Sequence, residues 1–369
     1  MSAITVDGDL VHYEVLGRGR PVVLLHGWIG SWRYWIPTMQ QLHLKYRVYA
    51  LDLYGFGDSS KKPEKYTLEQ QTRLLAEFMR QQGLPKAAMI GHGLGALVLT
   101  EFARANPDKV ARMLIASAPL YDPGDLDTRI PAGQRVLLTP DHHGPAATVE
   151  ALKDTPTIQP DGGTPDSQPA PGDTTVDSSH FAPTVPRVAQ DQQARLAEAM
   201  EAQLAATEAA AIPVTSPTDA GSSNQFVHNP LAESFGKADL ESLLVKCFKR
   251  SEPEFDKLKV DVDKTGKEVL QRSTESFDAG TMLDNVRELS APLVIVHGIA
   301  DPLIPDPGGS VWQYLTFNKE DTLLPIPLPS VRHFPMLEHE PFFRLVNDFL
   351  EIEDISKLEV KERWSRRTR

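Results

Sequence analysis

Short apolar runs alternate with longer segments whose apolar residues recur at helical spacing. Residues 21–27 (PVVLLHG) and 46–53 (YRVYALDL) are continuous apolar runs closed by turn residues, which is typical of strands buried on both faces. The same pattern predicts further strands at residues 87–90, 110–119, 291–298 and 321–329. Strands that alternate with helices predict an α/β fold, with a mostly parallel sheet covered by helices on both faces.

The periodic pattern stops at about residue 122. Residues 122–185 and 212–230 are rich in Pro, Gly, Asp, Ser and Thr, and we predict that both are loosely ordered. An alanine-rich helix is predicted between them, and residues 238–285 return to helical patterns. We therefore predict a core domain formed by residues 1–121 and 290–350, a cap insertion at 122–289 and a basic tail at 351–369.

Composition narrows the range of partners and compartments. The net charge is −12, which argues against a general surface for nucleic acid or anionic membranes. The chain has a single cysteine, no apolar run long enough to span a membrane and no recognisable leader, so we expect a cytoplasmic protein. The acidic insertion and the basic tail are the two features that a protein partner would recognise by their charge.

Residues 91–96 (GHGLGA) follow a predicted strand and open a predicted helix. They match the G-x-G-x-x-[GA] fingerprint of dinucleotide sites. However, the turn follows the fourth or fifth strand and no acidic residue stands about 20 residues on, so no cofactor is expected. No metal site is expected either, because His142 and His143 have no cysteine or paired acid at ligand spacing.

Five stretches together resemble the α/β-hydrolase family in their order and spacing. They are HGWIGSWRYW (26–35), DLYGFGDS (52–59), GHGLGA (91–96), HGIADPLIP (297–305) and RHFPMLEHEPFFRLVNDFL (332–350). In that family the third stretch is the sharp turn that carries the nucleophile. The resemblance implies the fold of that family, with the cap inserted after residue 121.

The resemblance also implies a site. Asp301 would be the acid, and His333 would be the base that it orients. The backbone amides of Leu94 and Trp28 would stabilise an oxyanion or bind a ligand carbonyl. Gly93 stands at the nucleophile position, where the family has serine, cysteine or aspartate.

Glycine offers no lone pair for attack, so the covalent route is closed unless another residue supplies the nucleophile. Ser59, Ser117 and Cys247 are the candidates. Arg332 is a second departure, because the family often has glycine before the histidine. His92 is interpreted as a packing residue.

Two functions remain open at this stage. The first is a non-hydrolytic member of the fold that binds a small molecule or a protein, the latter through the cap or the tail. The second is an enzyme without a covalent intermediate, in which His333 and Asp301 act as a general base on a small carbonyl or ester substrate.

Overall fold

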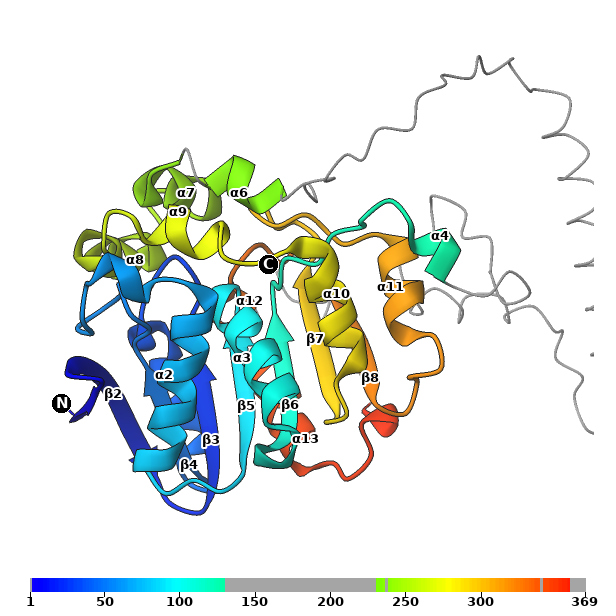
Figure 1. Cartoon of the computed structure of the whole chain (residues 1–369), viewed down its shortest axis with the longest axis horizontal. Helices are drawn as coiled ribbons and strands as arrows, with labels where there is room; N and C mark the ends of the chain where they lie inside the picture. Colours follow the sequence, from blue (N-terminus) through cyan, green and yellow to red (C-terminus); the bar gives the residue numbers. More distant parts are fainter. Residues whose placement is uncertain (1, 130–229, 236–237, 339–340, 359–369) are drawn as a thin grey trace, which may run out of the picture. The chain divides into compact units, whose positions relative to one another are not determined.

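An eight-stranded sheet runs through the chain in the order β1-β2-β4-β3-β5-β6-β7-β8 (Figure 1). All neighbouring strands from β4 to β8 are parallel, and β1 and β2 are antiparallel additions at one edge. The strands are β1 (Ser2–Val6), β2 (Asp9–Gly17), β3 (Arg20–Leu25), β4 (Tyr46–Leu51), β5 (Ala87–His92), β6 (Val110–Ala116), β7 (Leu293–Gly298) and β8 (Leu323–Leu328). The predicted fold class is therefore confirmed.

The apolar content of each strand matches its place in the sheet. β7, in the interior, is buried at every residue, because helices cover both of its faces. The edge pair differs: Leu10 and Leu16 of β2 are 53% and 39% exposed. The sequence pattern does not mark residues 2–17 as strands, because strands with one solvated face carry a weaker apolar signal.

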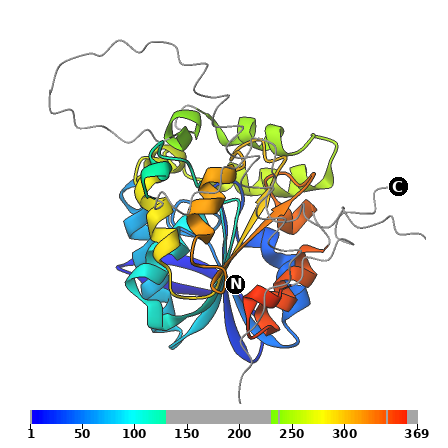
Figure 2. The same ribbon diagram turned by 90° about the vertical axis from the view of Figure 1, so that its right-hand side faces the viewer.

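Helices cover both faces of the sheet (Figures 1 and 2). One face carries α2 (Leu68–Gln81), α3 (Leu94–Ala105), α10 (Ala279–Glu288) and α11 (Gly309–Thr316); the other carries α1 (Ile36–Leu42) and α13 (Phe342–Glu351). α2 begins where the Thr67 hydroxyl accepts a hydrogen bond from the Gln70 amide, and its apolar side packs against α3. The layers thus form as the periodicity predicted.

A second group of helices lies over the carboxyl ends of the strands. It contains α6 (Pro230–Phe235), α7 (Leu240–Cys247), α8 (Pro253–Lys264) and α9 (Val269–Thr274), all from the segment predicted to form a cap (Figure 1). α10 comes from the same segment but packs against α3. The remaining helices are short: α4 (Leu126–Arg129), α12 (Pro335–Glu338) and the 3₁₀ turns Trp32–Trp35, Pro63–Lys65, Pro107–Lys109 and Ile355–Lys357.

The computed structural model describes residues 2–129, 230–235, 238–338 and 341–358. Most of the predicted loose segments, the alanine-rich helix and both His142 and His143 lie outside the described residues, as does the tail after residue 358. None of the helices within the described part is long and apolar enough to cross a membrane.

Candidate functional site

Gly93 forms the turn between β5 and α3. Its φ of 51° and ψ of −111° lie in a region that L side chains rarely adopt. Gly95 lets the loop after β3 approach closely: its amide donates to the carbonyl of His26 at 3.0 Å, and a Cβ there would lie 2.5 Å from the oxygen of Leu25. At Gly93, by contrast, an added Cβ would first meet the Trp28 ring at 3.3 Å, so the ring would have to move by a few tenths of an ångström.

Asp301 and His333 meet at the carboxyl edge of the sheet, after β7 and β8. His333 Nδ1–H donates to Asp301 Oδ2 at 2.8 Å, and both side chains are fully buried. The other carboxylate oxygen, Oδ1, accepts the amides of Leu303 and Ile304 at 2.8 and 3.0 Å. Burial raises the pKa of Asp301, but the His333 imidazole and these amides outweigh burial, so that pKa lies below its ordinary value. The carboxylate is therefore ionised and fixes the imidazole tautomer.

Hydrogen bonds from neighbouring strands hold the main chain of His333. Its carbonyl accepts His92 Nε2–H at 2.8 Å and the Ser117 hydroxyl at 3.0 Å. Burial lowers the pKa of His92 well below the ordinary value, so this ring is neutral and its Nδ1 accepts from the Tyr34 hydroxyl at 2.9 Å. His92 therefore does more than pack, a role that the sequence does not reveal because the two histidines are 241 positions apart.

These contacts leave one ring atom unused. His333 Nε2 is buried and has no hydrogen-bond partner among the described residues. With the proton on Nδ1, Nε2 carries a lone pair. A general base uses such a lone pair to accept a proton.

Leu94 and Trp28 flank the Gly93 turn. Leu94 is the first residue of α3, and neither its amide nor that of Trp28 finds an acceptor within the described part of the chain. The Trp28 indole is fully buried: its Nε1 donates to Ser273 of α9 at 2.8 Å, and its ring meets Phe235 of α6 edge-on. Trp28 thus joins the loop after β3 to the helices above the sheet.

The three candidate substitute nucleophiles are either hydrogen-bonded to other groups or buried. The Ser59 hydroxyl donates to the Asp52 carbonyl at 2.7 Å and accepts an amide, and the Ser117 hydroxyl donates to the His333 carbonyl. Cys247 is buried in α7, where burial raises the pKa of its thiol well above the ordinary value. These contacts and this burial argue against each of the three as the attacking group.

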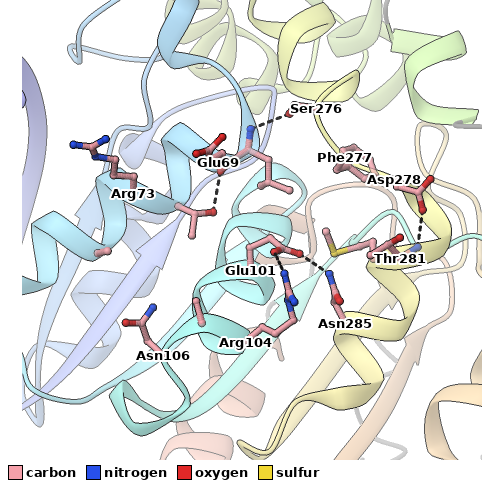
Figure 3. Close-up of a pocket in the computed structure, with 15 residues that line it drawn as sticks. Glu69, Arg73, Glu101, Arg104, Asn106, Ser276, Phe277, Asp278, Thr281 and Asn285 are labelled. Atoms are coloured by element: carbon pink, nitrogen blue, oxygen red, sulfur yellow. Dashed lines mark hydrogen bonds and ion pairs between the residues drawn. The ribbon is translucent and has the colours of Figure 1, made fainter.

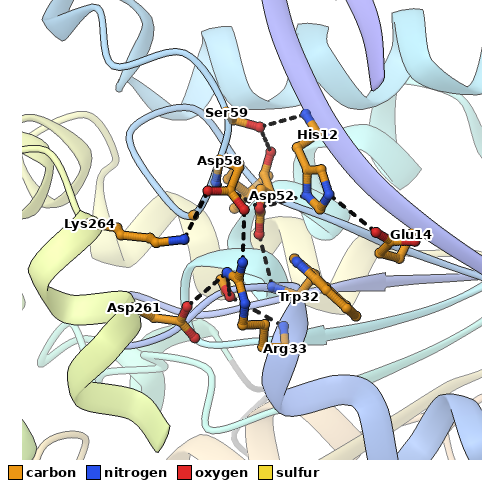
Figure 4. Close-up of polar contacts among 12 residues, drawn as sticks. His12, Glu14, Trp32, Arg33, Asp52, Asp58, Ser59, Asp261 and Lys264 are labelled. Atoms are coloured by element: carbon orange, nitrogen blue, oxygen red, sulfur yellow. Dashed lines mark hydrogen bonds and ion pairs between the residues drawn. The ribbon is translucent and has the colours of Figure 1, made fainter. Parts of the chain in front are cut away.

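A second buried His–Asp pair lies near the antiparallel edge of the sheet (Figure 4). His12 Nδ1 bonds Asp52 at 2.9 Å, and Asp58 completes a cluster whose atoms lie within 4.8 Å of one another, a spacing that suits a metal. However, the oxygens of Asp52 already accept the amides of Trp32 and Asp58, and those of Asp58 pair with cationic side chains. The cluster therefore links β2 to the loops after β3 and β4, which accounts for Asp52, Asp58 and Ser59 in the DLYGFGDS stretch.

A groove of about 520 Å³ opens between α2, α3 and α10 (Figure 3). Its wall carries Glu101, which pairs with Arg104 at 3.1 Å and accepts from the Asn285 amide at 2.6 Å. None of the groove's lining residues belongs to the Gly93 turn or to the His333–Asp301 pair.

Comparison with known proteins agrees with this architecture. The family model described as alpha/beta hydrolase fold matches residues 20–137. An esterase structure from Thermogutta terrifontis matches with a TM-score of 0.55 at 17% identity, over 95% of this chain and 98% of that one. The chain therefore has the α/β-hydrolase fold.

Sequence relatives match a shorter region. The bifunctional epoxide hydrolase 2 of Rattus norvegicus is 34% identical over 122 residues, which are 31% of this chain and 22% of the relative. The soluble epoxide hydrolase of Corynebacterium sp. strain C12 is 36% identical over 110 residues, 30% of this chain and 38% of the relative. The chain thus spans less than two fifths of these relatives.

Proposed function

We propose that this chain binds a small carbonyl or ester compound at the Gly93 turn and hydrolyses it without a covalent enzyme intermediate. The observation that carries this proposal is the buried Nε2 of His333, which has no described partner while Nδ1 is held by Asp301. A histidine oriented in this way is suited to take a proton from water. The hydrolase fold of the relatives supports the same reaction class.

In the proposed reaction, water attacks the substrate carbonyl carbon while its proton passes to His333 Nε2. The amides of Leu94 and Trp28 donate to the oxyanion that forms. When the tetrahedral intermediate collapses, the leaving alkoxide takes the proton back from His333, and the products are an acid and an alcohol. General-base assistance of this kind accelerates a reaction roughly 10²–10⁴-fold, so slow turnover is expected.

Gly93 is the reason that the proposed reaction has no covalent step. Its side chain is a hydrogen atom, so no acyl-enzyme forms at the turn. The same observation favours a second candidate, a non-hydrolytic protein that binds the carbonyl compound at the two amides and releases it unchanged. A cytoplasmic location, the cap role of residues 122–289 and a protein partner for the cap or tail stay predictions.

The purified chain should be screened with short-chain aryl esters, lactones and epoxides. We expect slow hydrolysis that His333→Ala abolishes. His12→Ala is the matched control, because it removes the other buried His–Asp pair of the described residues and should retain turnover. Loss of turnover in both variants would indicate a structural effect only.

A thermal-shift measurement with the same compounds separates the two candidates. No turnover together with a raised melting temperature supports the binder. A stable fluorophosphonate adduct on the unmodified chain would contradict both, since it would reveal a nucleophile elsewhere.

A further inference from the structure

Arg332 joins two glutamates from different parts of the chain. Its Nε donates to Glu338 of α12 at 2.7 Å, and its Nη atoms donate to both oxygens of Glu252 at 2.9 and 3.3 Å. Glu252 immediately precedes α8, and the guanidinium also lies over the Phe248 ring, 4.8 Å from its centroid. A planar fork with two carboxylates is a geometry that arginine provides and lysine does not.

Glu338 holds the backbone on both sides of His333. One of its oxygens accepts the Arg332 amide at 3.2 Å, and the other accepts the Phe334 amide at 3.0 Å. The Glu338 side chain is only 9% exposed, so its charge requires a close partner. Arg332 is that partner, and it therefore keeps the carboxylate in position to hold the His333 loop.

A separate group of ion pairs fastens the other end of α8 (Figure 4). Arg33 pairs with Asp261 at 3.1 Å and with Asp58 at 2.8 Å, and Lys264 pairs with Asp58 at 3.0 Å. Arg33 and Arg332 are matched in exposure, at 31% and 30%. They hold the same helix, but only Arg332 is bonded to the loop that carries His333.

We propose that Arg332 is a positioning residue, which couples the placement of the α8 segment to the orientation of the His333 imidazole. The inference rests on the proposed function only in taking His333 as the working group. Moving Glu252 away would leave Arg332 with one carboxylate and free to turn from Glu338. The amides around His333 would then lose their acceptor, and the Nδ1–H hydrogen bond to Asp301 would loosen.

The test follows the downfield proton resonance of His333 Nδ1–H in the full chain, assigned by its loss in His333→Gln. In Arg332→Gln we expect exchange of this proton with solvent to accelerate roughly tenfold, the size expected when one charge-assisted hydrogen bond is lost. Glu252→Gln should act in the same direction, and Arg332→Lys should not restore slow exchange. Arg33→Gln, the matched control, should leave the resonance unchanged.

Unchanged exchange in Arg332→Gln, or equal acceleration in Arg33→Gln, would overturn the inference. If Arg332→Gln fails to fold, Glu252→Gln and Arg332→Lys carry the same comparison. The resonance needs no turnover, so a failure of the proposed hydrolysis leaves this test intact. Where ester hydrolysis is measured, Arg332→Gln should lower kcat and leave KM nearly unchanged.

Discussion

At the scale of single residues, the positions around His333 differ in how far the sequence reveals them. Asp301 and His333 follow strands that end at the same edge of the sheet, so their meeting could be predicted from topology. The role of Arg332 could not, since its partner Glu252 is 80 positions away in a segment without a recognisable motif. In the sequence, Arg332 stands out only as a departure from the family pattern.

Gly93→Ala should lower the free energy of unfolding by about 1–3 kcal/mol, because the backbone there has a positive φ that alanine adopts only with strain. Gly83→Ala is the control: its φ is also positive, at 62°, and a Cβ there would meet nothing within 4 Å. Urea unfolding measures both. A much larger loss of unfolding free energy at position 93 than at position 83 would mean that the Trp28 ring cannot move aside for the added Cβ.

Gly93→Ser tests whether His333 and Asp301 can activate a nucleophile at this turn. The new hydroxyl would stand on the turn that already has the required backbone angles, so we expect faster aryl-ester hydrolysis and a fluorophosphonate adduct at position 93 by mass spectrometry. Absence of both in a folded variant would count against the proposed role of His333.

At the scale of elements, helix α8 is fastened at both ends by charges. Helical periodicity predicted helices in residues 238–285, and the described structure has α7, α8, α9 and part of α10 there. The ion pairs that orient α8 were not predictable. Their partners lie on loops after β3, β4 and β8, and only the folded sheet brings these loops together.

The Asp58 pairs should make stability depend on pH in the acid range. Burial raises the pKa of Asp58, but its bonds to Arg33 and Lys264 outweigh burial and lower that pKa from 3.8 to about 2. The contribution is therefore present above about pH 4 and is lost as pH falls toward 2. Asp58→Asn should flatten this part of the curve measured by urea unfolding, and Lys264→Gln should flatten it less. Identical pH curves for the unsubstituted protein, Asp58→Asn and Lys264→Gln would contradict the assignment of this pH dependence to Asp58.

At the scale of the whole molecule, a continuous hydrophobic core joins the sheet to the helices above it. Buried residues of β3, α7, α8 and α9 belong to the same cluster. The parallel order of the sheet was predictable from alternating strands and helices. The two antiparallel edge strands were not, because their apolar residues are partly solvated.

Cys247 reports on this shared core. It is the sole cysteine of the chain and is fully buried in α7. Reaction with an aromatic disulfide reagent should be negligible in the native protein and should rise in urea together with the tryptophan fluorescence change. Labelling at lower urea concentration than the fluorescence change would mean that the helices above the sheet open independently.

The backbone angles of Gly93 also have a genetic consequence. Two glycine codons, GGT and GGC, differ from serine codons by one nucleotide. Where codon 93 is GGT or GGC, a single base substitution would therefore place a serine hydroxyl on this turn, in a chain whose His333 imidazole is already held by Asp301. From either of these codons, one nucleotide separates the present chain from the Gly93→Ser variant.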